Sequence, residues 1–299
     1  MSATERIEER GQPEGQAMNA GRYALKKLPQ VTLVFWIMKI AGTTLGETGG
    51  DEFAQTLKLG YFVATIALFV VFLFTLLLQL RAKKYNPFYY WTVIVTTSMA
   101  GTTISDFMNR DASSKYLKAG VSQLGSGPQG LGIGYPAGMA ILLSLLAGVF
   151  LIWKRTGLTF DINKINTFRG EAIFWTAILI SNTLGTSLGD FLSDSSGLGY
   201  TGAAILISAA LVVLFGLRYI GQVPNVLLFW AAFVLTRPWG ASVGDYLTKP
   251  VAKGGLNLGT FGASMILLAV LLGFMGAMSL RERSRSVDQK LAYQGGSVR

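Results

Sequence analysis

Long apolar segments recur along the chain from Pro29 onward. Each holds about twenty residues, which at ~1.5 Å per residue is enough for an α-helix to cross the ~30 Å hydrocarbon core of a membrane. We place these helices near 30–50, 60–80, 88–107, 134–153, 171–190, 199–217, 225–245 and 259–280. The segments lack both the polar face of a soluble bundle helix and the strict alternation of a membrane β-strand. The pattern therefore predicts an all-α polytopic membrane protein with eight transmembrane helices.

Polar segments divide the chain into larger units. Residues 1–28 are polar and of mixed charge, which predicts a flexible cytoplasmic tail rather than a signal peptide. We expect a first membrane half over 29–153, a cytoplasmic linker over 154–170, a second membrane half over 171–280 and a basic cytoplasmic tail over 281–299.

One motif occurs in every second predicted helix. An aromatic residue and a Trp open the helix, and Gly, Ser or Thr, Gly or Ser, and Asp follow the Trp by ten, twelve, fourteen and fifteen residues. Each copy heads a unit of two helices, so all four units enter the membrane in the same direction. This predicts four parallel two-helix repeats around an axis along the membrane normal. The Trp residues are Trp36, Trp91, Trp175 and Trp230, and the Asp residues are Asp51, Asp106, Asp190 and Asp245.

The other four predicted helices begin with two small residues four positions apart. Small residues at this spacing let two helices approach closely in lipid, so we interpret them as packing positions. The pairs are Gly60 and Ala64, Gly134 and Gly138, Gly199 and Ala203, and Gly259 and Ala263. The four Trp residues of the first motif are typical of an aromatic belt at the membrane interface.

Four tandem two-span repeats, each with a fixed Trp and a Gly- and Thr-rich segment that ends in Asp, resemble a bacterial family of membrane proteins whose repeat has no assigned function. The resemblance covers roughly residues 30 to 280. It implies a multi-pass protein of the bacterial cytoplasmic (inner) membrane, and it supplies neither a reaction nor a substrate.

The composition narrows the chemistry. The chain has no Cys and no His, which excludes disulfides, thiolate or imidazole metal ligands, and Ser-His-Asp triads. The remaining chemistry must come from carboxylates, hydroxyls, amides and the backbone. An enzyme could use paired carboxylates, but no nucleophile and base stand together in the sequence, so we expect neither an enzyme nor a bound cofactor.

The distribution of charge indicates an orientation. Of the 26 basic residues, 18 fall on the side that holds both termini. Six fall on the opposite side, at Lys58, Arg110, Lys115, Lys118, Lys249 and Lys253. The positive-inside rule then places both termini in the cytoplasm. The basic excess is an orientation signal in the lipid bilayer, and no nucleic acid is expected as a partner.

The Asp of the motif is the candidate ligand for a cation. Each Asp lies about 30 Å of helix away from the cytoplasmic start, hence at the outer rim, where it could equally end a helix. The hydroxyls and glycines ahead of it favour a ring of carboxylates, hydroxyls and exposed carbonyls. Such hard oxygen ligands suit Mg²⁺, Mn²⁺, Ca²⁺ or monovalent ions. The candidate metal ligands are Asp51, Asp106, Asp190 and Asp245, with the hydroxyls of Thr48, Thr103, Ser187 and Ser242 beside them.

The four repeats are not identical: at positions within the predicted helices, some copies carry a charged residue where the others carry a neutral one. Seven residues after each Trp stand Thr43, Ser98, Asn182 and Arg237, and the first repeat adds Lys39 and Glu47. Ionisable groups within a membrane are usually paired and functional. We hypothesise that Glu47 faces the interior and is balanced by Arg237 or Lys39, either as a fixed ion pair or as an exchanging carboxylate.

Together these features predict an integral membrane transporter or exporter of a cation, including divalent ones. The predicted pathway comprises Glu47, Thr48, Asp51, Thr103, Asp106, Asn182, Ser187, Asp190, Arg237, Ser242 and Asp245. The alternative is a noncatalytic membrane scaffold or sensor whose repeats are packing motifs. The expected partners are the lipid bilayer and the transported cation, and a homo-oligomer is left open.

Overall fold

The computed structural model describes residues 28–110, 130–165 and 167–296, with side chains described as far as residue 280. The predicted tail over 1–28 lies outside the described residues except for Leu28. The described part is all-α. Its long helices are α2 (Leu33–Asp51), α3 (Gly60–Arg81), α4 (Pro87–Asn109), α6 (Tyr135–Arg155), α7 (Phe168–Asp190), α8 (Gly199–Ile220), α9 (Asn225–Thr248) and α10 (Thr260–Gly296).

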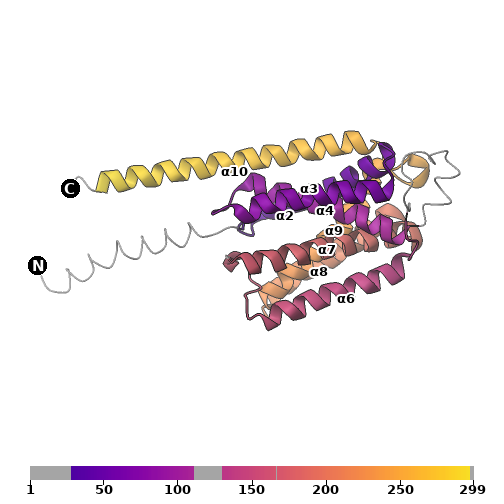
Figure 1. Ribbon diagram of the computed structural model, residues 1–299, viewed down its shortest axis with the longest axis horizontal. Coiled ribbons are helices and arrows are strands. Elements are labelled where there is room, and N and C mark those ends of the chain that lie inside the picture. Colours follow the sequence, from indigo (N-terminus) through magenta and orange to yellow (C-terminus); the bar gives the residue numbers. More distant parts are fainter. Residues whose placement is uncertain (1–27, 111–129, 166, 297–299) are drawn as a thin grey trace, which may run out of the picture.

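Each predicted helix is present, with ends within three residues of the prediction, apart from the end of α10. This helix continues past residue 280 to Gly296 and extends beyond the bundle (Figure 1). Three of the helices begin with an N-cap residue whose side chain accepts a hydrogen bond from the first turn. Thr32 accepts from the N–H of Phe35 at the start of α2, and Asn86 and Thr167 do the same for α4 and α7.

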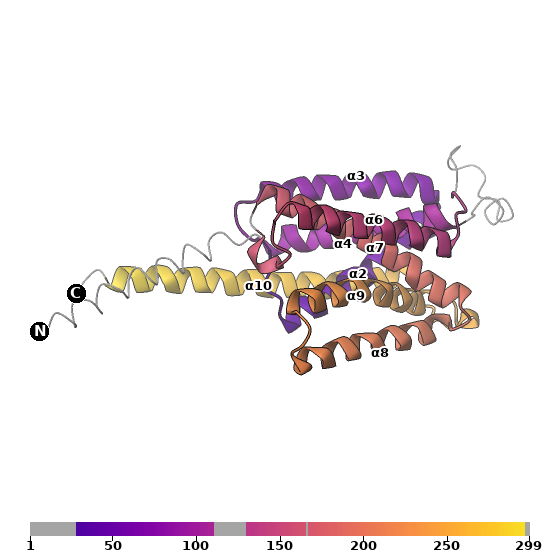
Figure 2. The ribbon, with the colours of Figure 1, turned by 90° about the horizontal axis from the view of Figure 1, so that it is seen from below.

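Four helices form a closed inner ring. The helices α2, α4, α7 and α9 carry the four Trp motifs, and each packs against the next in that order, with α9 returning to α2. The other four surround them. Figures 1 and 2 show α10 and α6 on opposite sides of the ring, and α3 and α8 on the remaining two sides.

Each outer helix packs mainly on the inner helix of the following repeat. Thus α3 lies on α4, α6 on α7, α8 on α9, and α10 returns to α2. The last repeat therefore closes on the first. The outer helix of every repeat thus packs on the next repeat around the ring, which is the arrangement expected for parallel repeats around a single axis.

Among the described residues, six helices are long and apolar enough to span a membrane: α3, α6, α7, α8, α9 and α10. The sequence predicts eight spans, and α2 and α4 are the two helices outside this set. Both have the length of their neighbours but are more polar: α2 carries Thr residues with Lys39, Glu47 and Asp51, α4 carries Thr and Ser residues with Asp106, and most of these are buried inside the ring. Because the surrounding helices shield these polar side chains from lipid, α2 and α4 can have a lower hydropathy than the outer helices.

The motif glycine ten residues after each Trp lets the inner helices touch. A Cβ on Gly46 would lie 2.2 Å from the Cβ of Ser98, and one on Gly185 would lie 2.5 Å from Arg237 Cγ. Gly101 meets Asn182 and Gly240 meets Thr43 in the same way. The helices run through these glycines without a break, so the expectation that the glycine segments expose backbone carbonyls to a pathway is wrong here. They provide close approach.

The glycines that begin the outer helices have a different role from the packing predicted for them. Gly60, Gly134, Gly199 and Gly259 all have positive φ, between 65° and 81°, a region that glycine enters at little cost. They turn the chain into the outer helix. The small residue four positions later provides the packing, since Ala64, Gly138, Ala203 and Ala263 are buried.

The Trp residues do not form an interfacial belt, which corrects the prediction. Trp91, Trp175 and Trp230 are buried, and Trp36 is partly buried. Each lies against the aromatic residue that opens the preceding repeat, with ring centroids 5.5 to 5.9 Å apart. The four contacts are Phe35 with Trp91, Tyr90 with Trp175, Phe174 with Trp230, and Phe229 with Trp36. We call these eight residues the aromatic ring; it fills one end of the inner bundle.

Candidate ion-binding site

The other end of the inner ring holds the acidic residues of the motif. Asp51 and Asp190 are the last residues of α2 and α7, while Asp106 and Asp245 lie in the last turn of α4 and α9. All four are at most 2% exposed. They therefore do not merely end helices at the water boundary. They face inward, together with Glu47 one turn deeper on α2.

Glu47 is paired with Arg237 across the ring. The Nη2 atom of Arg237 lies 3.1 Å from Glu47 Oε2 and also donates to Thr102 Oγ1. Its Nη1 atom donates to the carbonyl of Thr43, and the carbonyl of Ser98 accepts from Nη2. One guanidinium from α9 thus links α2 and α4. Thr102 was not predicted, although it occupies the position of Glu47 in the second repeat.

Lys39 does not pair with Glu47. Its side chain is fully buried, its Nζ lies 3.9 Å from the centroid of the Phe233 ring, and Nζ has no hydrogen-bond partner among the described residues. It lies two helical turns from Glu47 along α2, toward the aromatic ring. Of the two partners considered for Glu47, the structure brings Arg237 to it.

Asp51 and Asp245 share the ammonium of Lys249. Its Nζ lies 2.6 Å from Asp51 Oδ2 and 3.1 Å from Asp245 Oδ1. Gln55 donates to the other oxygen of Asp51 at 2.5 Å. Burial alone would lower the pKa of Lys249, but Asp51 and Asp245 outweigh burial and hold that pKa well above its usual value. Lys249 is therefore a cation.

Asp106 and Asp190 share the guanidinium of Arg110 in the same way. Its Nε lies 2.6 Å from Asp106 Oδ1 and its Nη2 lies 2.7 Å from Asp190 Oδ2. Asp194 approaches Nη1 at 3.7 Å, and the hydroxyl of Tyr135 donates to Asp190. Burial alone would lower the pKa of Arg110, but the neighbouring carboxylates outweigh burial and hold that pKa well above its usual value.

The two bridges are related by the duplication of the chain. Residues 139 apart occupy equivalent places, so Arg110 corresponds to Lys249, Asp106 to Asp245 and Asp51 to Asp190. The predicted single ring of four carboxylates is therefore divided into two pairs, each closed by a cation of the protein. Arg110 and Lys249 were assigned to outer loops. Their position four residues after an Asp, one helical turn away, was the available signal.

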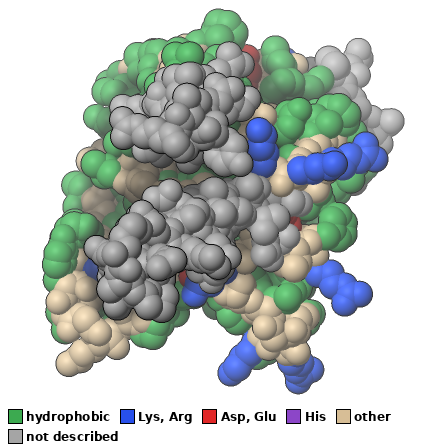
Figure 3. Space-filling view, turned by 90° about the vertical axis from the view of Figure 1, so that its left-hand side faces the viewer, with side chains coloured by type: hydrophobic (Ala, Val, Ile, Leu, Met, Phe, Trp, Pro, Cys, Tyr) green, Lys and Arg blue, Asp and Glu red, His purple; other side chains and the backbone are tan. Residues whose placement is uncertain are grey.

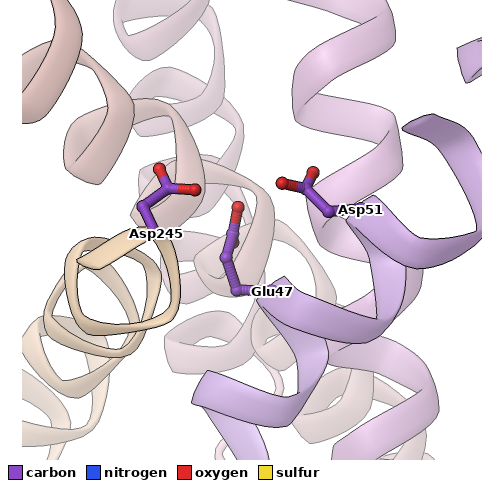
Figure 4. Close-up of side chains that lie close together, drawn as sticks. All are labelled: Glu47, Asp51 and Asp245. Atoms are coloured by element: carbon purple, nitrogen blue, oxygen red, sulfur yellow. The ribbon is translucent and has the colours of Figure 1, made fainter. Parts of the chain in front are cut away.

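Three carboxyl groups approach one another closely enough to hold a metal ion. Oxygen atoms of Glu47, Asp51 and Asp245 all lie within 4.8 Å of one another. Figure 4 shows the three groups turning toward a common space, two from α2 and one from α9. This set includes two of the four predicted metal ligands and adds Glu47. Asp106 and Asp190 belong to the Arg110 pair instead.

The predicted hydroxyl residues mostly join helices. Thr48 binds Ser264 of α10 at 2.8 Å, and Ser242 accepts from Ser193 at 3.4 Å. Ser187 lies 2.8 Å from Ser105 of α4, while Thr103 donates to carbonyls of its own helix. Asn182 donates to Ser98. These contacts stabilise the ring, and none of them reaches the three-carboxylate cluster.

The four repeats match a known family. The profile of a family described as a repeat of unknown function (DUF347) matches residues 34–85, 89–159, 173–222 and 228–284, one match for each two-helix unit. Neither a curated protein nor a solved structure matches the sequence.

Proposed function

The chain belongs to the DUF347 repeat family, and on that premise we propose that it is a membrane transporter or exporter that moves a cation through the inner ring. It performs transport rather than catalysis. The cluster of Glu47, Asp51 and Asp245 is the binding site. A divalent cation such as Mg²⁺, Mn²⁺ or Ca²⁺ suits its three oxygen ligands.

The proposal includes eight membrane spans, with α2 and α4 crossing as sheltered inner helices. The end of the bundle with the aromatic ring faces the cytoplasm of a bacterial inner membrane. Figure 3 views this end, where Lys and Arg side chains stand at the periphery. Once Arg110 and Lys249 are recognised as internal ion pairs, four basic residues are left on the opposite side, which strengthens the positive-inside bias.

A buried excess of carboxyl groups is the observation that carries the proposal. Glu47 and the four motif Asp residues share three basic partners, Arg237, Lys249 and Arg110. If all five acids were ionised, the network would hold two uncompensated negative charges. Buried charge of this kind is costly, so the network requires bound cations or protons. Oδ2 of Asp106 and Oδ1 of Asp190 also have no hydrogen-bond partner among the described residues.

The two ends of the inner ring fit a carrier. The acidic end reaches solvent through the side chains of Arg110 and Lys249, which are 21% and 19% exposed. The aromatic ring fills the other end. In such a carrier the cation reaches the acidic cluster from the outer side past Arg110 and Lys249, and it leaves toward the cytoplasm when the aromatic ring separates.

A flux measurement in liposomes tests the proposed function. Purified protein should increase the flux of at least one of Mg²⁺, Mn²⁺, Ca²⁺, Na⁺ and K⁺ above that of protein-free liposomes. The variant Asp51→Asn leaves Lys249 paired with Asp245, so the fold should survive. Flux should nevertheless fall by ~10-fold or more, because changes around metal ligands typically cost ten- to hundred-fold.

Asp161→Asn is the matched control. It makes the same chemical change in the segment between α6 and α7, where Asp161 pairs with Lys164 at 3.5 Å, far from the acidic cluster along the chain. Its flux should equal that of the wild type. Equal flux for both variants would remove Asp51 from the pathway, and no flux of any of the five ions would refute transport.

The packing role of the motif favours a second candidate function. Its glycines and hydroxyls join helices, which is what a noncatalytic membrane scaffold or sensor needs. This candidate gains support if the folded protein moves no cation at all. The buried excess of carboxyl groups has no role in such a scaffold, which is why transport is preferred.

A further inference from the structure

The two halves of the chain position their bridging cations by the same backbone device. After α9, the N–H groups of Leu256 and Leu258 donate to the carbonyls of Tyr246 and Leu247. An equivalent pair of bonds forms in the first half, where Leu131 and Ile133 donate to the carbonyls of Phe107 and Met108, the residues 139 positions before Tyr246 and Leu247. In both halves the segment that leads into the next outer helix binds the last turn of an inner helix. The basic residue that follows this turn is thereby held over the acidic end.

The chemical difference between the halves is the kind of cation. Arg110 presents a planar guanidinium whose Nε and Nη2 atoms each bind a different carboxylate, with Asp194 near the third nitrogen. This geometry fixes the group in place, because a guanidinium is planar and permanently charged. Lys249 presents a compact ammonium on a flexible stem, which can leave its position by side-chain rotation.

The carboxylates around the two cations also differ. Glu47 of the Lys249 half corresponds to Thr186 in the Arg110 half, and Gln55 corresponds to Asp194. The third acid near Lys249 thus lies inside the ring, whereas the third acid near Arg110 is 36% exposed. Within the described residues, a cluster able to hold a metal ion is found around Lys249. The ammonium of Lys249 already contacts two of the three carboxylates in this cluster, those of Asp51 and Asp245.

We infer that Lys249 is a tethered stand-in for the transported cation: its ammonium occupies the exchangeable site and is displaced when a divalent cation binds Glu47, Asp51 and Asp245. The Arg110 half is a permanent structural bridge. The inference rests on the proposed function and identifies which of the two equivalent half-sites exchanges its cation. Replacing one positive charge with two also reduces the excess of negative charge in the network.

Selective acetylation of Lys249 tests the displacement directly. Purified wild-type protein in detergent is treated with a water-soluble acetylating ester, with and without MnCl₂, and the modified lysines are quantified by mass spectrometry. Mn²⁺ should increase the acetylation rate of Lys249 by about tenfold, the factor that corresponds to losing an ion pair worth ~1.4 kcal/mol. Lys253, four residues away and exposed, is the internal control and should not change.

Charge-conserving variants provide a second test. Lys249→Arg keeps the positive charge and should fold, but its guanidinium would lock onto Asp51 and Asp245. We expect Mn²⁺ binding to weaken by about tenfold or more, again the equivalent of one ion pair. Arg110→Lys makes the converse change at the equivalent position and should leave Mn²⁺ binding within about twofold of the wild type, because that half does not exchange its cation.

The outcomes separate this inference from the proposed function. The inference is overturned if Mn²⁺ binds the wild type without exposing Lys249, or if Lys249→Arg binds Mn²⁺ as the wild type does. It is also overturned if the wild type binds no Mn²⁺ but still transports a monovalent ion, a result that leaves transport intact. A protein that neither binds nor transports any of the five cations overturns both.

Discussion

Arg237 is the residue on which the interior of the inner ring depends most. It is fully buried, and its guanidinium contacts a carboxylate, a hydroxyl and two backbone carbonyls on α2 and α4. Gly185 leaves space for its stem, since any side chain there would collide with Arg237 Cγ. Removing one partner of a buried ion pair leaves the other charge unpaired, which typically costs ~3–5 kcal/mol.

Arg237→Gln should therefore destabilise the protein strongly, because Glu47 loses its cation. The double variant Arg237→Gln with Glu47→Gln should recover a substantial part of this loss, since two neutral amides leave no buried charge. Thermal unfolding in detergent measures both. Losses that simply add in the double variant would show that the two residues do not act as a pair.

At the level of helices, contacts between consecutive inner helices recur around the ring. The glycine ten residues after each Trp contacts the residue seven after the next Trp, and the aromatic residue before each Trp contacts the next Trp. One set brings the helices together in the middle of the ring. The other fills its end. A repeated sequence produces both because every interface is a copy of the same one.

Gly46→Ala should destabilise the interface between α2 and α4. The added Cβ would lie 2.2 Å from the Cβ of Ser98, and overpacking of this kind typically costs ~1–3 kcal/mol. Gly148→Ala in α6 is the control, because a Cβ there meets nothing within 4 Å. Its midpoint of thermal unfolding should stay the same or rise slightly. Equal midpoints for the two variants would contradict the close approach at Gly46.

For the whole molecule, the proposed orientation places the basic end of the bundle in the cytoplasm and the acidic end outside. Exposed basic residues such as Lys83, Lys154 and Arg169 surround the end with the aromatic ring. Lys253 belongs to the short helix Val251–Lys253 that follows α9 at the acidic end. The two ends can therefore be distinguished by labelling.

The absence of native Cys makes this labelling direct. In intact cells, a membrane-impermeant maleimide should modify the variant Lys253→Cys, while Lys83→Cys should react only after the cells are opened. Western blotting of the labelled protein gives the readout. Labelling of Lys83→Cys in intact cells would invert the orientation, and labelling of both positions would contradict a single topology.

The positions of the helices, their grouping into repeats and the shared direction of the four units were predictable from the residue order. Apolar length and the spacing of the Trp motif are local properties, and a duplicated sequence implies duplicated interfaces. The acidic end was predictable for the same reason, because Asp51, Asp106, Asp190 and Asp245 stand at one distance from the start of each repeat.

The pairing of charges depended on how the ring closes. Whether Glu47 meets Arg237 or Lys39, and which carboxylates Arg110 and Lys249 join, is set by which inner helix lies beside which. Burial of the Trp residues follows from the same closure. Such contacts link residues up to 198 positions apart, and no local pattern specifies them, because a side chain selects its partner only after the helices have packed.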